Sequence, residues 1–457
     1  MKNNRYLSLL AAATLLTVAA CAPLGKYTAT QTVPDGLYTA TDKASENDNI
    51  ALLSWNQYYT DPQLQSLIQT ALDNNADLKI AQEHIAQAQA AVSGAKLAFV
   101  PTLHLDANVG TSIVQGQGAS DAAFSISANP TWELSIYRKI TTLKSNKVTA
   151  QMMEDYKQAV QSSLVANVAN CYYTLLMLDA QLRIAIETDS VWEKSVRTIN
   201  ALKTEGFADE VAVNQYAATL AGIKATTIDL RRQITIAENN LSLLLNQPCQ
   251  HIARGTLASQ NVPSSLSTGV PMQLLTLRPD VRAAGREIEV AFYTTRNAWL
   301  NFFPTITLSG QPGLTNNISG VIVPTTAIAN LSAGIIAPIL NGGYNRTQLK
   351  IAESQQKEVA LKFDKTVYNA AMEVNNALCE LQSTQQQQPY YEAQVNSLTK
   401  ARHDTELLMQ NSQDKTYLDV LTAHNALFEA QFSLVANRTQ QLIAATRLYE
   451  ALGGGAL

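Results

Sequence analysis

The sequence predicts a mixed α and β membrane protein in which four short strands per chain are continuous with long α-helices. Three observations point to this fold class. Four segments of about ten residues alternate between apolar and polar side chains, and two much longer segments carry apolar residues at steps of three and four. The whole pattern also occurs twice along the 457-residue chain. A net charge of -4, without a Lys/Arg-rich block, argues against a nucleic-acid partner.

The N-terminus predicts an export signal. Two basic residues precede an apolar run over residues 7–17, and small residues then lead to Cys21. This run is too short to cross a bilayer. The segment resembles a bacterial lipoprotein signal, which implies an acylated Cys21 and, with Ala22 next to it, an address in the outer membrane. We therefore expect a signal peptide over 1–20 and a lipidated N-terminal segment over 21–60; an ordinary signal peptide is the alternative.

The two halves of the chain are related by an internal tandem duplication. A shift of 203 positions lays residues 75–105 over residues 278–308. The identical pairs include Asp77 with Asp280, Ile85 with Ile288, Ala95 with Ala298, Phe99 with Phe302 and Leu105 with Leu308. We expect repeats over 61–261 and 262–457, each consisting of a helix of about 35 residues, two strands joined by a loop, and a long helical hairpin.

The alternating segments predict strands at about 102–111, 122–131, 304–313 and 328–338. In the first of them, Leu103, Leu105, Ala107 and Val109 alternate with His104, Asp106 and Asn108. Proline has a fixed φ and no N–H, so it suits the boundary between a helix and a strand. Four prolines are expected at such junctions: Pro101, Pro130, Pro304 and Pro338. The length and the pattern are those of transmembrane β-strands.

The long periodic segments predict helical hairpins at about 138–246 and 346–451. Their apolar residues form a narrow coiled-coil stripe, for example Leu164, Val168, Leu175 and Leu178 in the first and Phe363, Val367, Val374 and Leu381 in the second. A cytosolic helical bundle would show the same stripe, but it would leave the four amphipathic strands without a purpose.

Four membrane strands cannot stay alone, because lipid offers no hydrogen-bond partner to an open sheet edge. About eight strands make the smallest filled barrel, so two, three or four copies of the chain would give eight, twelve or sixteen strands. The polar faces favour a water-filled barrel of twelve or more. His104, Asp106 and Asn108 are then expected to face the lumen.

Several motifs together resemble one known family. They are WNQYYTDPQLQSLIQTALDNNADL (55–78), LRPDVRAAGREIEVA (277–291), FFPTITLSG (302–310), TYLDVLTAHNAL (416–427) and RLYEALGGG (447–455). The chain resembles the outer-membrane efflux proteins, the lipoprotein branch of the TolC-like channels. This resemblance implies a homotrimer with a twelve-stranded barrel in the outer membrane and a long α-helical coiled-coil barrel in the periplasm. It also implies two pump partners, a periplasmic adaptor (membrane fusion) protein and an inner-membrane transporter of the resistance-nodulation-division type.

The resemblance implies a passive exit duct for drugs or other small toxic compounds, with no enzymatic activity, cofactor or resident metal. The five histidines lack the spacing of metal ligands on one helix face. Export of metal ions and type I protein secretion remain open as alternative roles within the channel class. A periplasmic coiled-coil structural lipoprotein is the alternative from a different class.

Acidic residues near the second-half helical tip form the periplasmic gate in this family. Here the tip carries Asp414, Lys415 and Asp419, and Thr422 stands where a second acid is common. Alternatively, Asp414 and Asp419 complement the positive N-terminus of the following helix. Both roles remain open from the sequence.

Overall fold

The computed structural model describes residues 27, 50–110, 113–114, 118–119, 122–261, 277–318, 326–411 and 416–455. The chain divides into the units Met1–Val33 and Pro34–Leu457, and all the helices and strands of the described residues belong to the second. The expected signal peptide and Cys21 lie outside the described residues.

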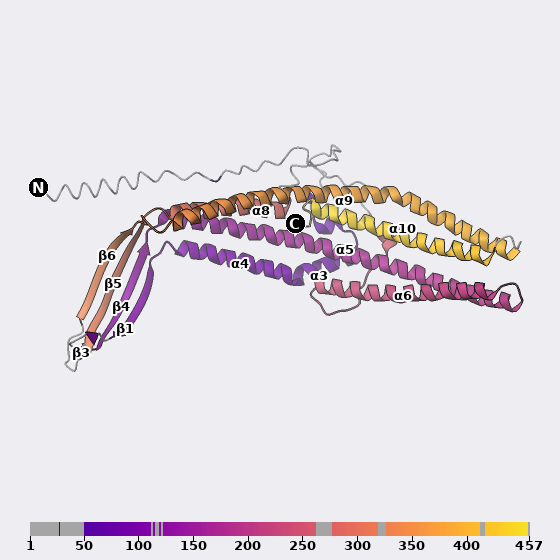
Figure 1. Ribbon diagram of the computed structural model, residues 1–457, viewed down its shortest axis with the longest axis horizontal. Helices are drawn as coiled ribbons and strands as arrows, with labels where there is room; N and C mark the ends of the chain where they lie inside the picture. Colours follow the sequence, from indigo (N-terminus) through magenta and orange to yellow (C-terminus); the bar gives the residue numbers. More distant parts are fainter. Residues whose placement is uncertain are drawn as a thin grey trace. The chain divides into compact units, whose positions relative to one another are not determined.

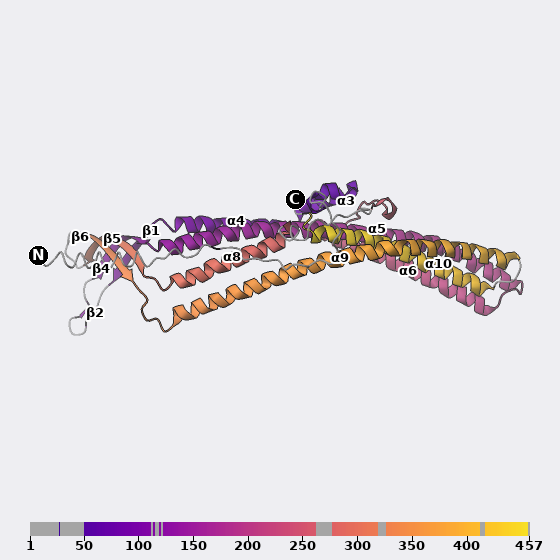
Figure 2. The ribbon, with the colours of Figure 1, turned by 90° about the horizontal axis from the view of Figure 1, so that it is seen from above.

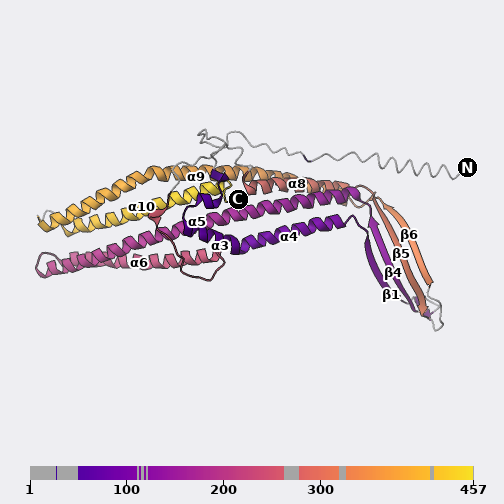
Figure 3. The same cartoon turned by 180° about the vertical axis from the view of Figure 1, so that it is seen from behind.

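Four antiparallel strands form one sheet in the order β1-β4-β5-β6. Their bounds are Thr102–Gly110 for β1, Ala122–Glu133 for β4, Thr305–Ile318 for β5 and Thr326–Ile336 for β6. A short hairpin, β2 (Ile113–Val114) with β3 (Gly118–Ala119), lies between β1 and β4 in sequence. Each repeat contributes one strand pair, and β4 pairs with β5 between the repeats. Figures 1 and 3 show the four strands side by side, with β1 and β6 at the two edges.

Long helices continue from the strands. They are α4 (Ala76–Leu97), α5 (Ile136–Thr204), α8 (Pro279–Leu300) and α9 (Tyr344–Asn411), and α5 and α9 contain 69 and 68 residues. Two helices return along them, α6 (Glu210–Leu244) against α5 and α10 (Tyr417–Ala451) against α9 (Figure 1). The helices within the described part of the chain lack the combined length and apolar character that a membrane span requires.

The prediction of a single helix of about 35 residues before the first strand is wrong. The structure has two helices there, α3 (Pro62–Asn74) and α4, divided at Asn75. The Asn75 side chain accepts hydrogen bonds from the backbone N–H groups of Asp77 and Leu78 and so caps α4. Its amide also donates to the Leu244 carbonyl at 3.0 Å, which fixes the break against the end of α6.

The predicted coiled-coil stripes are confirmed as the buried faces of the long helices. In α9 the buried residues recur at steps of three and four: Phe363, Val367, Ala370, Val374, Ala377, Leu381 and Thr384. In α5 they include Leu164, Val168, Leu175 and Leu178. These stripes pack α9 against α10 and α5 against its neighbours.

The largest core lies midway along the helices, where both ends of the described chain return. It collects buried side chains from α3, α5, α6 and α10, including Leu64, Ile68, Tyr172, Leu241 and Tyr449. Tyr58, at the end of the short helix α2 (Trp55–Tyr58), packs against this core. The two remaining short elements are the 3-10 helices η1 (Ile50–Leu52) and η2 (Leu257–Ser259).

A proline lies inside the longest stripe-bearing helix of the second repeat. Pro389 of α9 has no N–H to donate to the preceding turn. Just before it, the Thr384 carbonyl accepts side-chain amides of α10, from Asn437 at 3.2 Å and Gln441 at 3.1 Å. Gln441 also donates to Gln388 at 2.8 Å. Pro389 leaves the Gln385 carbonyl without its helical donor, and the buried amides of α10 hold α9 at the residue just before it. Helix α9 curves along its length in Figure 1.

Candidate functional site in the strand sheet and at the hairpin tips

The register of the sheet separates a polar face from an apolar face. One row across all four strands consists of Thr102, Thr131, Ser309 and Ser332, which are successive partners. The hydroxyl oxygens of Ser309 and Ser332 lie 2.7 Å apart. A row of opposite orientation consists of Ala107, Ile126, Leu314 and Ala327. Because side chains alternate along every strand, this register makes one face hydroxyl-rich and the other aliphatic.

The predicted lumen residues His104, Asp106 and Asn108 all lie on the polar face, in the same orientation as Thr102. Asn129 of β4 donates a hydrogen bond to Asp106. On the other face of β1, Leu103, Leu105 and Val109 expose 70–77% of their surface. Such exposed aliphatic side chains require an apolar environment or a partner.

Three of the four predicted junction prolines lie between a helix and a strand. Pro101 separates α4 from β1, Pro304 separates α8 from β5, and Pro338 follows β6 before α9. The prediction for Pro130 is wrong, because this residue lies inside β4, which continues to Glu133. The junction between β4 and α5 lies after Glu133. Next to it, the Trp132 indole N–H donates to the Phe99 carbonyl at 3.0 Å.

Pro130 is tolerated in β4 because the contact with β5 is interrupted there. The β4–β5 pairing covers Ser127 with Gly313 and resumes at Thr131 with Ser309, and Pro130 and Pro312 both fall in the gap. Next to this gap the strands approach closely. A Cβ on Gly313 would lie 2.7 Å from the Ile126 carbonyl oxygen, so only glycine fits.

The tips of the two hairpins meet in one aromatic cluster. Trp192 of α5 is 1% exposed, and its ring centroid lies 5.2 Å from that of Tyr216 in α6 and 5.6 Å from that of His424 in α10. The Tyr216 hydroxyl donates to the Tyr417 carbonyl at 2.9 Å. Figures 1 and 2 show the ends of α5, α6, α9 and α10 next to one another. We call Trp192, Tyr216, Tyr417 and His424 the tip cluster.

The acidic residues at the tips cap the returning helices. Asp209 is the N-cap of α6 and accepts from the Ala212 N–H at 2.8 Å. In α10, Asp419 accepts from the Thr416 N–H and hydroxyl, both at 2.9 Å, in a capping box. The capping role predicted for Asp419 is therefore present, and its exposed side chain leaves the predicted gate role open. Asp414 and Lys415 lie outside the described residues.

The buried Arg278 side chain joins the start of α8 to the end of α10. Burial alone would lower the pKa of Arg278, but its ion pairs with Asp280, at 2.7 Å, and Glu373, at 2.8 Å, outweigh burial and raise it. Arg278 also donates to the Ala451 carbonyl at 2.9 Å. Close by, burial raises the pKa of Glu450 to about 7, with a smaller contribution from Glu373.

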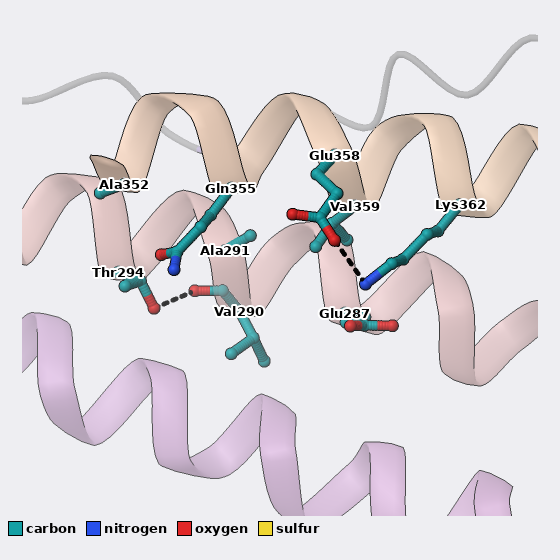
Figure 4. A pocket seen from close by; sticks show the side chains of 9 residues that line it. All are labelled: Glu287, Val290, Ala291, Thr294, Ala352, Gln355, Glu358, Val359 and Lys362. Atoms are coloured by element: carbon teal, nitrogen blue, oxygen red, sulfur yellow. Dashed lines mark hydrogen bonds and ion pairs between the residues drawn. The ribbon is translucent and has the colours of Figure 1, made fainter. Parts of the chain in front are cut away.

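A groove of about 320 Å³ runs between α8 and α9 (Figure 4). Lys362 and Glu358 of α9 form an ion pair of 2.8 Å along the α9 side of the groove, with Glu287 of α8 beside them. A similar groove of about 310 Å³ lies between α4 and α5 and includes His84, which is the repeat equivalent of Glu287. The two grooves therefore share this lining position, which lies on the equivalent helices α4 and α8.

The comparison with protein families decides the identity of this arrangement. The model of the family described as outer membrane efflux protein matches residues 67–247 and 270–454. The chain belongs to the outer membrane efflux protein family. Its two matched spans begin 203 residues apart, which is the shift that aligns the two halves. This efflux protein therefore contains two tandem copies of the family unit, as the sequence predicted.

Relatives and solved structures agree with the family. The chain is 27% identical to the cation efflux system protein CusC of Escherichia coli O6:H1, covering 89% of each chain. It is 26% identical to the toluene efflux pump outer membrane protein TtgC of Pseudomonas putida, covering 88% of this chain and 85% of TtgC. A crystal structure of CusC, 25% identical, superposes with a TM-score of 0.81 and covers 95% of this chain and 100% of its own.

More distant structures share the fold. The outer-membrane channel OprN, 22% identical, superposes with a TM-score of 0.83 over 94% of this chain and 99% of its own. The protein thus has the TolC-like fold, with four antiparallel strands and long helices in two repeats. Family membership identifies this efflux protein as an outer-membrane channel and not an enzyme.

The tip cluster of this efflux protein was not predicted from the sequence. Tyr417 and His424 fall within the tip motif, but nothing in their spacing shows that Trp192 and Tyr216, some two hundred residues earlier, contact them. The repeat offset gives no pairing between the two hairpins. An aromatic residue in each of three helices near the expected turns was the one available signal.

Proposed function

We propose that this protein, as a homotrimer, forms the exit duct of a tripartite efflux pump and passively conducts drugs or other small toxic compounds across the outer membrane. The observation that carries the proposal is the four-stranded sheet with one aliphatic face, one polar face and two edge strands, β1 and β6. A lipid-facing sheet cannot keep open edges, so β1 of one copy must pair with β6 of the next.

Three copies give a barrel of twelve strands. Eight strands from two copies would fill the interior with side chains, whereas twelve leave room for water. In such a barrel Leu103, Leu105 and Leu331 face lipid, and His104, Asp106 and Asn108 face the lumen. The polar row of hydroxyl side chains supports a wetted wall.

The long helices support a periplasmic extension of the same duct. Because α4, α5, α8 and α9 continue from the strands, three copies would place twelve helices around the axis of the barrel. The hairpin tips are then the farthest part from the membrane and the natural contact for a periplasmic adaptor protein. An inner-membrane transporter of the resistance-nodulation-division type would supply the free energy, and an acylated Cys21 would anchor each chain in outer-membrane lipid.

The experiment that tests the channel is conductance of the purified protein. Detergent-extracted protein should have the mass of three chains, migrate differently before and after heating, and form water-filled pores in planar bilayers. A periplasmic structural lipoprotein would give no conductance and no heat-modifiable migration, which would refute the proposal.

The cargo is tested separately, because the relatives include proteins named for both cation and toluene efflux. A bacterial strain that lacks its own outer-membrane channel should regain resistance to organic toxicants when this chain is expressed with its cognate adaptor and transporter. Resistance to copper or silver alone would favour metal-ion export, and secretion of a protein substrate alone would favour type I secretion.

A further inference from the structure

The tip cluster contains a buried histidine that contacts both an acidic side chain and an aromatic ring. His424 of α10 is 7% exposed, and its Nε2 lies 2.6 Å from the Glu406 carboxylate of α9. Its ring packs against Trp192 of α5 at an interplanar angle of 61°. A single side chain therefore contacts two other tip helices, one from each hairpin.

Side chains from three other helices, α5, α6 and α9, surround His424 or its aromatic neighbour. Glu406 and Arg402 of α9 are the charges that face the imidazole, and Trp192 of α5 covers its ring. Tyr216 of α6 packs on the same indole, and burial together with Glu406 raises its pKa to about 12, so it stays neutral. His424 is the member of this group whose ordinary pKa lies near neutral pH.

The cluster is not fully satisfied. The Trp192 indole N–H is buried without a hydrogen-bond partner. A buried, unpaired donor costs free energy that is regained when water reaches it. The unpaired indole N–H therefore offsets part of the packing free energy of this contact and favours a hydrated, open state.

We propose that the contact of His424 with Glu406 and Trp192 is a pH-sensitive latch that holds the two hairpin tips together at neutral pH and releases them when the periplasm becomes acidic. The inference rests on the proposed channel function and adds a form of regulation to it. At neutral pH the uncharged imidazole donates its Nε2–H to Glu406. In acid, a second proton places a charge in a pocket that holds little water, next to the positive Arg402.

The direction of the pH response follows from the burial of His424. Burial lowers the pKa of His424 below its usual 6.5, Glu406 opposes this, and Arg402 adds to it. The packed state therefore binds the proton less well than an open, hydrated state does. The latch is intact above pH 6.5 and weakens as the pH falls below it. Each pKa unit between the two states changes the ratio of open to closed tips by about tenfold at low pH.

The test is the pH dependence of the full-length trimer in planar bilayers between pH 8 and pH 5. The conductance of the native protein should rise severalfold as the pH falls below 6.5. His424→Gln keeps an amide donor for Glu406 but cannot titrate, so its conductance should be flat over this range. His403→Gln is the matched control, because His403 is exposed on the same helix as Glu406 and its loss should leave the pH response intact.

Hydrogen exchange of the native protein keeps the proposal testable if His424→Gln fails to assemble. After correction for intrinsic rates, the peptide 417–428 should lose protection between pH 7.5 and pH 5.5. A native conductance that ignores pH, or an unchanged response in His424→Gln, would overturn the latch. Absence of conductance at every pH would refute the channel, whereas the exchange experiment would still report on the latch.

Discussion

Tyr58 lies flat on Tyr449, with ring centroids 4.0 Å apart and ring planes inclined by 5°. The pair joins the first described helices to the end of α10. The Tyr58 hydroxyl donates to the Ala445 carbonyl at 2.8 Å, and the Tyr449 hydroxyl donates to the Leu53 carbonyl at 2.6 Å. Burial raises the pKa of Tyr58, so the donating proton is retained at any physiological pH.

Truncation of Tyr58 should destabilise the core midway along the helices. Tyr58→Ala removes the stack and the hydrogen bond and should cost about 3 kcal/mol or more, whereas Tyr58→Phe should cost about 1 kcal/mol. Thermal unfolding of the purified protein, followed by circular dichroism, should show the larger loss of stability for Tyr58→Ala. Tyr390→Ala removes a tyrosine that is 77% exposed and should leave the melting temperature almost unchanged. Equal losses for Tyr58→Ala and Tyr390→Ala would contradict the assignment.

Adjacent residues of β6 should respond oppositely to a charge. Leu331 lies on the aliphatic face and is 91% exposed in the single chain, whereas Ser332 lies on the polar face. Leu331→Arg should disfavour insertion by about 2–4 kcal/mol at the membrane centre, and Ser332→Arg should be tolerated. The yield of heat-modifiable trimer in outer-membrane fractions measures both. If Ser332→Arg were the damaging change, the lipid and lumen faces would have to be exchanged.

Asp419 can be tested for a role in the gate without destroying its cap. Asp419→Asn removes the charge but keeps a side-chain oxygen for Thr416. If three copies of Asp419 form an acidic ring, Asp419→Asn should raise the conductance and weaken block by divalent cations. Asp419→Ala should do the same and also lower the melting temperature slightly. Asp404→Asn, at an exposed site of α9, serves as the control. Unchanged block in Asp419→Asn would leave Asp419 with its capping role alone.

The burial of Glu450 should make the stability of the folded protein depend on pH. Burial raises its pKa from 4.5 to about 7, so the folded state binds its proton more tightly than the unfolded state does. Stability is therefore complete below pH 4.5 and decreases as the pH rises through 7, by up to about 3 kcal/mol at pH 8. Glu450→Gln should raise the melting temperature at pH 8 and have little effect at pH 5. A difference that is independent of pH would show that Glu450 does not titrate in this range.

Much of the fold could be predicted from the spacing of apolar residues along the chain. Alternation over Leu103 to Val109 and steps of three and four from Phe363 to Leu381 correspond to β1 and to the buried face of α9. The errors have local causes. Asn75 ends α3 and caps α4 within one continuous apolar pattern, and Pro130 stays in β4 because the pairing of β4 with β5 is interrupted there. Both depend on a partner that is distant in sequence.

The two repeats, the amphipathic strands and the coiled-coil stripes can be predicted without a structure, because they are properties of residue spacing along one segment. Which segments meet depends on the folded chain: β4 pairs with β5 across the repeats, the amides of α10 contact the turn before Pro389, and Trp192 contacts His424 at the tips. Such contacts depend on how elements far apart in the chain pack together, and packing distances are not encoded in the period of any single helix or strand.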